Sequence, residues 1–221
     1  MRHATASWSP VATRHRPPRT KRGVRFMEAA IVTALICASV ACSGESTAPP
    51  DTGNPQVEIA TSMGTLTVEL MPEKAPLTVD NFLKLVDDGF YVGTVFHRVI
   101  PNFMIQAGGY DVDLAYREPP RTVVNESANG ALNVRWTIAM ARHSDPDSAD
   151  SQFFINVADN AHLDARPDRP GYTVFGTLIA GRETAEDIEL AETGPVGDKI
   201  SVPLEPIVIL STRRVSGVES E

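Results

Sequence analysis

The chain has 221 residues, enough for one ordinary domain with appended segments. Apolar residues make up 42% and charged residues 22% of the chain, a balance typical of a globular protein that excludes a collagen-like repeat, a coiled coil or a wholly disordered chain. From Ser43 onward 13 basic residues face 27 acidic ones, a net charge of −14. This charge repels phosphate backbones, so we expect no nucleic-acid partner.

Residues 1–41 have the profile of a signal peptide. Seven basic residues precede the apolar run at residues 29–41, which is too short for a membrane span of roughly 20 residues. Small residues stand directly before Cys42, an arrangement that resembles the lipobox of bacterial lipoproteins, although Ser39 occupies a position where leucine is commonest. The resemblance implies that Cys42 is lipidated. An ordinary cleavable signal or a short anchor helix is the alternative.

Three segments flank the predicted domain: an N-terminal head, a linker and a C-terminal tail. Residues 1–26 are long and polar for the head of a signal peptide, and we hypothesise that translation starts near Val24 and that residues 1–23 are an artefact of gene annotation. Residues 42–56 are rich in Gly, Ser, Thr and Pro, which predicts a flexible linker. The folded domain should then span residues 57–215, with a disordered tail at 216–221.

The domain itself reads as a series of strands interrupted by two helices. Residues 57–61 and 64–70 alternate apolar and polar side chains, which predicts an amphipathic hairpin. Residues 78–86 have helical spacing, with Thr78 able to cap and Gly89 as a stop. Further β-like runs lie at 94–100, 103–107, 137–141, 153–157, 172–178 and 206–210, and a second helix near 183–191. This pattern predicts a mainly β fold, a closed eight-stranded antiparallel barrel capped by two α-helices, because closure removes exposed edges.

Two of these runs carry residues that indicate a binding surface. The sequence FHRVIPNFMIQAGG reads as two strands around a Pro-Asn turn. Because side chains alternate along a strand, Arg98 should face away from His97. By the same rule Met104 and Gln106 should share one face, and Phe103 should point the other way.

The second run, SQFFINV, places Gln152 and Phe154 on one face of its strand. Both cysteines, Cys37 and Cys42, lie at the N-terminal side, so the predicted domain has no disulfide, thiolate metal site or cysteine nucleophile. No HExxH, GxSxG or Walker sequence occurs, and no nucleophile and base pair is apparent. The residues alone therefore predict an apolar groove with an arginine, and we expect neither a cofactor nor a metal.

These segments resemble those of the cyclophilins. The hallmark of that family is a Phe-His-Arg strand followed by a Pro-x-Phe-Met turn, then Gln and glycines, with Ser-Gln-Phe-Phe-Ile downstream. The resemblance runs from about Val57 to Leu210 and includes segments 138–142, 160–164 and 174–176. It is closest to the bacterial periplasmic branch and implies a peptidyl-prolyl cis/trans isomerase that accelerates rotation about X–Pro bonds as exported proteins fold.

The resemblance also implies roles for individual residues. Arg98 would be catalytic and would donate a hydrogen bond to the prolyl amide as its resonance is lost. Gln106 would orient Arg98 or the substrate, the backbone of Ala141 and Arg142 would hold the residue before proline, and Gln152 would extend the groove. An apolar pocket for the proline ring would be formed by Phe103, Met104, Phe154 and Leu163, with His162 at its rim and Tyr172 at its far side.

Three positions depart from the family pattern. His162 stands where many cyclophilins have tryptophan and bacterial ones often phenylalanine, Tyr172 replaces a common histidine, and Arg142 takes an asparagine position. A more polar and less filled rim implies weak binding of cyclosporin. His97 is expected to be a buried or hydrogen-bonded strand residue and His143 a solvated loop residue.

The implied partners are proline-containing unfolded or partly folded polypeptides. Contact with a membrane is expected only through the lipid anchor, at the cell envelope and on the periplasmic side if the organism is Gram-negative, and the protein is expected to be a monomer. A non-catalytic module that binds proline segments as a chaperone is the alternative function, and a purely structural envelope lipoprotein is a third.

Overall fold

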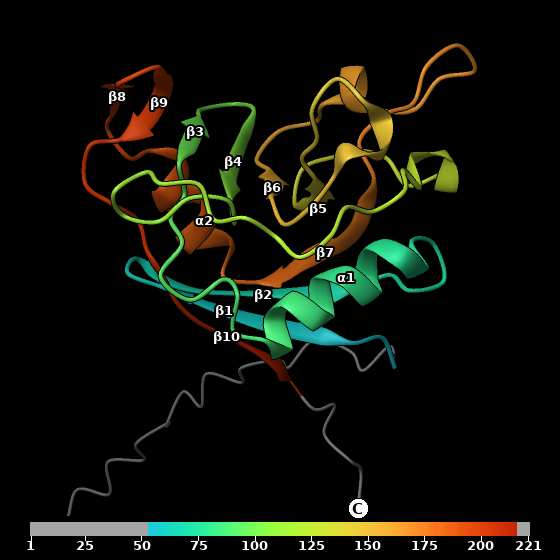
Figure 1. Cartoon of the computed structure of the whole chain (residues 1–221), viewed down its shortest axis with the longest axis horizontal. Coiled ribbons are helices and arrows are strands. Elements are labelled where there is room, and N and C mark those ends of the chain that lie inside the picture. The colour runs from blue at the N-terminus through green and yellow to red at the C-terminus, as the bar shows by residue number, and fades with distance from the viewer. Residues whose placement is uncertain (1–52, 216–221) are drawn as a thin grey trace, which may run out of the picture. The chain divides into compact units, whose positions relative to one another are not determined.

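The computed structural model describes residues 53–215 (Figure 1). The predicted signal peptide 1–41, the predicted lipidation site Cys42, most of the predicted linker 42–56 and the tail 216–221 lie outside the described residues. Within the described part no helix is long and apolar enough to cross a membrane.

An eight-stranded sheet forms the body of the molecule, and each neighbouring pair of strands is antiparallel. The strands are β1 Gln56–Thr61, β2 Gly64–Leu70, β3 Arg98–Ile100, β4 Met104–Ala107, β5 Thr137–Met140, β6 Phe153–Asn156, β7 Val174–Ala180 and β10 Ile209–Val215. Their order across the sheet is β10-β1-β2-β7-β5-β6-β4-β3. The predicted hairpin and the six later β-like runs are confirmed as strands, although the structure shifts the bounds of most of them.

The sheet is an open, curled half-barrel, so the predicted closed barrel is wrong. The edge strands β3 and β10 do not pair with each other. Only scattered backbone bonds link the chain before each of them, as from Phe96 N to Ile207 O at 2.9 Å. These bonds join residues 93–96 to residues 207–209, ahead of β3 and at the start of β10, and β3 itself pairs with β4 alone among the strands of the sheet.

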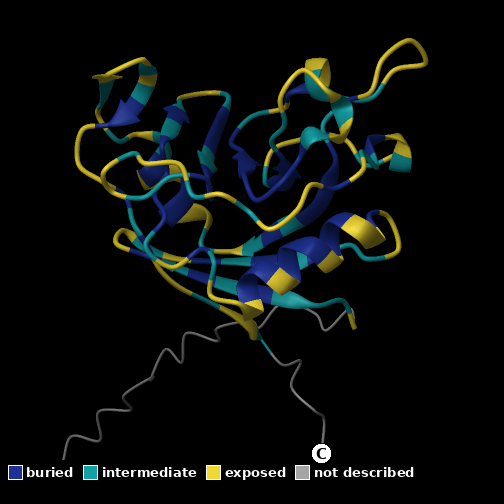
Figure 2. Cartoon of the chain, viewed as in Figure 1, coloured by how far each residue is buried: buried dark blue, intermediate teal, exposed yellow. Residues whose placement is uncertain are grey.

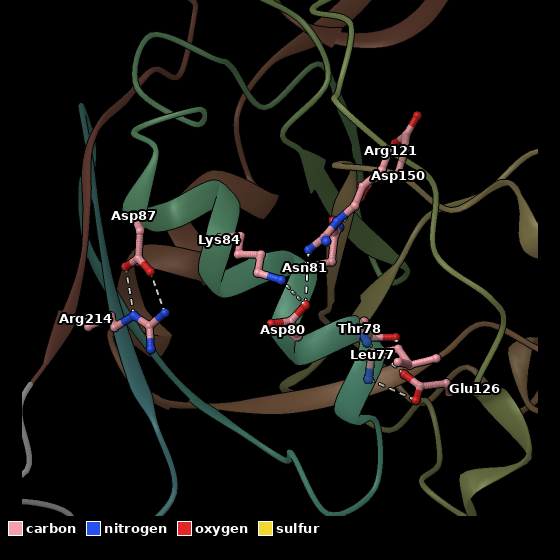
Figure 3. A network of polar contacts seen from close by, with 10 residues as sticks. All are labelled: Leu77, Thr78, Asp80, Asn81, Lys84, Asp87, Arg121, Glu126, Asp150 and Arg214. Carbon is pink, nitrogen blue, oxygen red and sulfur yellow. Dashed lines mark hydrogen bonds and ion pairs between the residues drawn. The ribbon is translucent and has the colours of Figure 1, made fainter.

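Two α-helices pack against the sheet, as predicted. Helix α1, Pro76–Asp87, lies against β10, and α2, Arg182–Glu189, contacts β2, β3 and β4 (Figure 1). The predicted cap by Thr78 is wrong, because the helix begins two residues earlier at Pro76, whose fixed φ suits a first helical position. The helix terminus is instead satisfied by Glu126, whose carboxylate accepts hydrogen bonds from the backbone N–H groups of Leu77 and Thr78 (Figure 3).

Several short elements were not predicted. Strands β8 Thr193–Val196 and β9 Lys199–Pro203 form a separate two-stranded sheet. The sequence of β8 contains Gly and Pro, and the alternation of β9 covers only Lys199–Val202 before Pro203, which explains why the pattern did not reveal them. Three short 3-10 helices also occur, η1 Ser127–Asn129, η2 Pro146–Ser148 and η3 Ala161–Leu163.

The sheet has two apolar faces of different size. One face belongs to the main core, and the row Val99, Ile105, Ile155 and Ile138 crosses four strands there with every side chain fully buried. The other face of the sheet carries a small second cluster around Met104, Ala139, Phe154 and Val174, on β4, β5, β6 and β7. Figure 2 shows the buried residues concentrated on the strands and on one side of α1, with exposed residues on the loops. The second cluster forms the floor of the candidate site.

Candidate active site

The strand register brings the predicted site residues onto one face. Arg98 on β3 lies opposite Gln106 on β4, which lies opposite Phe154 on β6, and Phe154 lies opposite Ala139 on β5. Residues that are directly opposite in an antiparallel sheet project from the same side. Four strands therefore present one continuous row of side chains that starts with a guanidinium and ends in the apolar cluster.

A pocket of about 210 Å³ opens on this face. Its floor is apolar, since Met104 is 2% and Phe154 is 4% exposed. Half-buried Phe103 and Leu163 form walls. The residues that line the pocket are Arg98, Phe103, Met104, Gln106, Ala141, Arg142, Phe154, Leu163 and Tyr172. All the predicted site residues within the described part meet here except Gln152 and His162.

Phe103 reaches the pocket because it does not belong to a strand. It lies in the turn between β3 and β4, so the alternation that predicted the opposite face does not apply to it. Its backbone oxygen accepts hydrogen bonds from Asn160 Nδ2 at 2.8 Å and from Val157 N at 3.1 Å. These bonds fix the turn, and the ring stands as a wall of the pocket.

Arg98 is half-buried at the edge of the pocket and has no anionic partner. Its Nη1 donates to Gln106 Oε1 at 3.5 Å and contacts Met104 Sδ at 3.8 Å. No carboxylate of residues 53–215 lies within ion-pair distance of it. Burial lowers the pKa of Arg98 from its ordinary value, yet a guanidinium stays charged at physiological pH. Its remaining N–H donors are therefore available to a ligand in the pocket.

Two glutamines connect Arg98 to a neighbouring pocket. Gln106 Nε2 donates to Gln152 Oε1 at 3.1 Å. Gln152 lines an adjoining pocket of about 320 Å³, which shares Arg98, Gln106, Ala141 and Arg142 with the smaller one. Gly109 leaves room for this glutamine, because a Cβ at that position would lie 2.5 Å from Gln152 Cγ. Gln152 therefore lies beside the smaller pocket, and its role in extending the groove stays a prediction.

The far wall of the pocket is held by Arg142. Its guanidinium carbon lies 4.7 Å from the centre of the Tyr172 ring, and its Nε donates to Gly171 O at 3.2 Å. Tyr172 in turn meets Phe154 edge to face at 5.7 Å. The side chain of Arg142 therefore packs against the pocket wall, in addition to any contact that its backbone makes.

The three histidines near the site differ in environment. His162 is exposed and stacks on Phe103 at 5.5 Å, outside the pocket lining. His97 is buried as predicted, with its ring 4.6 Å from that of Tyr110 and no hydrogen-bond partner for Nδ1. Burial lowers the pKa of His97 to about 4. His143 is exposed, as predicted, and lines the larger pocket.

The sequence prediction missed two polar residues that support the site. Asn160 holds the backbone of Phe103, and Asp150 accepts hydrogen bonds from the backbone N–H groups of Ser151 and Gln152. Asn and Asp often accept from backbone groups a few residues on, so an Asp just before Ser-Gln was the available signal. Their long-range partners, Phe103 for Asn160 and Tyr116 for Asp150, are distant in sequence and could not be predicted from local patterns.

The arrangement favours binding over bond-breaking chemistry. The pocket of about 210 Å³ is lined by two guanidinium groups, those of Arg98 and Arg142, and by the amide of Gln106, but by no serine, cysteine, histidine or carboxylate. Among the described residues no cluster of His, Cys, Asp and Glu is placed to hold a metal ion. The fold and the pocket together define a protein with a binding site for a small apolar group beside hydrogen-bond donors.

A family model described as cyclophilin type peptidyl-prolyl cis-trans isomerase/CLD matches residues 56–214. The chain therefore belongs to the cyclophilin family and is an enzyme of the peptidyl-prolyl cis-trans isomerase class. It is 46% identical over 160 residues to a peptidyl-prolyl cis-trans isomerase of Acinetobacter baylyi, covering 72% of this chain and 85% of the relative. It is also 46% identical over 185 residues to peptidyl-prolyl cis-trans isomerase A of Dickeya dadantii, covering 84% and 95%.

Solved structures agree with this assignment. A crystal structure of a cyclophilin type peptidyl-prolyl cis-trans isomerase of Cryptosporidium parvum superposes with a TM-score of 0.62 at 28% identity, over 74% of this chain and 99% of that chain. A second crystal structure of that protein, in the presence of the dipeptide Ala-Pro, gives a TM-score of 0.61 at 30% identity, over 73% and 99%.

Proposed function

We propose that this chain accelerates rotation about X–Pro bonds by binding the proline ring in the pocket and directing Arg98 at the prolyl nitrogen. The observation that carries the proposal is a guanidinium without a carboxylate partner, at the edge of an apolar pocket of about 210 Å³. The family to which the chain belongs supplies the class of reaction. The placement of Arg98 beside Phe103, Met104 and Phe154 supports the proposed mechanism.

The barrier to the reaction arises from amide resonance. Rotation about a peptide bond crosses about 18–20 kcal/mol because the C–N bond has partial double-bond character. In the twisted state the nitrogen lone pair is localised and becomes a good hydrogen-bond acceptor, whereas in the planar state it is not. A donor at this nitrogen therefore stabilises the transition state more than the ground state, as catalysis requires.

Arg98 suits this role because its position is set before substrate binds. Gln106 and Met104 contact the guanidinium, and its Cζ lies 5.9 Å from the centre of the Phe103 ring. Donors that are already oriented need no reorganisation during the reaction, and loss of one such donor typically costs on the order of 100-fold in rate. The apolar floor of Met104 and Phe154 holds the ring, and burial of a side chain of this size contributes about 2 kcal/mol to binding.

The proposal is tested by a coupled proteolysis assay of the full chain on an Ala-Pro peptide. Arg98→Ala should lower kcat/KM about 100-fold with an unchanged circular dichroism spectrum. Arg213→Ala is the control, because this arginine is exposed on β10 and pairs with Glu58 away from the pocket. Equal rates for Arg98→Ala and the unmodified chain would contradict the proposed mechanism. Peptide binding without turnover in the unmodified chain would favour the chaperone module instead.

We also propose that the enzyme acts on exported polypeptides at the cell envelope, as a monomer tethered through a lipid on Cys42. The support is the sequence before and after that cysteine, with basic residues, an apolar run and small residues in order. Labelling of cells with a radioactive fatty acid should mark the unmodified chain and leave Cys42→Ser unmarked. Equal labelling of the two would contradict the anchor, and light scattering of the purified chain would check the monomer.

A further inference from the structure

Asp150 is a buried carboxylate without a cationic partner. It is 6% exposed and lines the larger pocket beside Arg98. No lysine, arginine or histidine of residues 53–215 lies within ion-pair distance of it. Burial of an unpaired charge is unfavourable unless hydrogen bonds compensate, and such costs are commonly retained where a site requires them.

Hydrogen bonds from three groups compensate the carboxylate. Oδ1 accepts from Ser151 N at 2.5 Å and from Gln152 N at 3.1 Å, and Oδ2 accepts from Tyr116 Oη at 2.7 Å. The backbone oxygen of Asp150 also accepts from Asn81 Nδ2 at 2.7 Å, so α1 holds the residue from the other side (Figure 3). Burial and the carboxylate raise the pKa of Tyr116, which therefore remains a donor at physiological pH.

Asp150 holds the backbone of Gln152. Side-chain hydrogen bonds then connect Gln152, through Gln106, to the guanidinium of Arg98. Gln152 Oε1 accepts from Gln106 Nε2 at 3.1 Å, and Gln106 Oε1 accepts from Arg98 Nη1 at 3.5 Å. Gly109 packs so closely on the side chain of Gln152 that a Cβ there would lie 2.5 Å from Gln152 Cγ. The side chain therefore lies in a narrow slot, and its direction depends on how its backbone is held.

We propose that Asp150 is a positioning residue for the isomerase reaction. Its carboxylate holds the backbone of Gln152, so that Gln152 and Gln106 together keep the Arg98 guanidinium directed into the proline pocket. This inference rests on the proposed function of Arg98. Asp150 does not line the smaller pocket that would hold the proline ring, and its effect on the reaction passes through Gln152. Tyr116 contributes by holding the second oxygen of the carboxylate.

The test is a double-mutant cycle on kcat/KM of the full chain. Asp150→Ala should lower kcat/KM about tenfold, mainly through kcat, because small displacements of a catalytic group are costly while the pocket for the ring is unchanged. In a Gln152→Ala background the same substitution should have little further effect. Asp150→Asn retains an oxygen for the backbone N–H groups and should restore most of the activity. Unchanged activity of Asp150→Ala, or a loss that multiplies with that of Gln152→Ala, would overturn the proposal.

A measurement without substrate separates this inference from the proposed function. In ¹⁵N NMR spectra, Asp150→Ala should shift the side-chain amide signals of Gln152 and Gln106, whether or not the chain is active on the peptide. Asp159→Ala is the matched control, because its exposed carboxylate also accepts from a backbone N–H, that of Arg135, and neither pocket includes it. Unmoved glutamine signals in Asp150→Ala would overturn the positioning role.

A milder substitution covers the case in which Asp150→Ala does not fold. Tyr116→Phe removes one hydroxyl from a residue that is 41% exposed and leaves the backbone bonds to Oδ1 in place. It should lower kcat two- to threefold as an order-of-magnitude expectation for one lost hydrogen bond, and this loss should vanish in the Gln152→Ala background. Persistence of the loss in that background would count against the proposal.

Discussion

The guanidinium carbon of Arg98 lies 5.9 Å from the centre of the Phe103 ring. The first residue begins β3 and the second lies in the turn that follows it, so a short tight turn brings a charged donor and an apolar wall to the same pocket. A cation at this distance from an aromatic face is attracted to the ring. The ring therefore helps to hold the guanidinium in addition to forming a wall of the pocket.

Arg98→Lys tests whether charge alone is sufficient. A lysine keeps the positive charge but loses the rigid planar arrangement of donors, so we expect kcat/KM to fall by about 10- to 100-fold, almost as far as in Arg98→Ala. The coupled assay measures the ratio, with Arg213→Lys as the control. Activity close to that of the unmodified chain would show that the geometry of the donors is unimportant.

Phe103→Ala tests the apolar wall. The residue is half-buried and lies in a turn held through its backbone, so the free energy of unfolding should fall by less than about 2 kcal/mol. The proline ring would lose a surface, and we expect kcat/KM to decrease about tenfold. Urea denaturation and the coupled assay give the two quantities. A large loss of stability with unchanged activity would assign Phe103 to the fold alone.

His162→Trp tests the rim. His162 is exposed and stacks on Phe103, and we expect the unmodified chain to bind cyclosporin weakly. A larger indole at this position should cover more apolar surface of a bound ligand and tighten the complex about tenfold, since roughly 25 cal/mol is gained for each Å² buried. A fluorescence titration measures both dissociation constants. A tight complex with the unmodified chain would show that residue 162 does not control binding.

Glu126→Ala tests the junction between α1 and the distant loop. The carboxylate accepts hydrogen bonds from Leu77 N, Thr78 N and Thr78 Oγ1 at 2.7–3.1 Å. Loss of an acceptor at a helix N-terminus should lower the free energy of unfolding by about 1–2 kcal/mol. Urea denaturation checks this, with exposed Glu205→Ala as the control. Equal midpoints for the two variants would contradict the capping role.

The buried imidazole of His97 should make the folded chain less stable in mild acid. Burial lowers its pKa in the folded state to about 4, against an ordinary value of 6.5. Between these two values the unfolded chain binds a proton that the folded chain does not, so stability decreases as the pH falls from 6.5 to 4. The contribution can reach about 3 kcal/mol. The free energy of unfolding should depend on pH in the same way for the unmodified chain and for His97→Gln above pH 7. Below pH 6.5 it should fall more steeply for the unmodified chain. Parallel curves over the whole pH range would contradict the lowered pKa of His97.

Local patterns in the sequence were sufficient for the faces of the strands. Alternation placed Arg98 and Gln106 correctly, and the register later aligned them with Phe154. Alternation is a property of each strand alone, so no knowledge of neighbouring elements is needed to read it. The same reasoning predicted the hairpin of β1 and β2 and the approximate bounds of both helices.

Features that join distant segments could not be read in this way. Glu126 satisfies the start of α1 from 48 residues away in the sequence, and Tyr116 reaches Asp150 across 34 residues. Whether the edge strands β3 and β10 pair and close the barrel likewise depends on tertiary contacts, because these strands are far apart in the sequence.

The sequence by itself determined which side chains share a strand face and, through its motifs, the family. The tertiary structure alone decided that Phe103 enters the pocket from a turn, that His162 remains outside the pocket lining, and that Asp150 lies behind Gln152. The physical reason is the range of the forces involved. Side-chain alternation follows from the geometry of adjacent residues, whereas burial, hydrogen bonding of a carboxylate and closure of a sheet depend on the packing of segments that the chain brings together only when it folds.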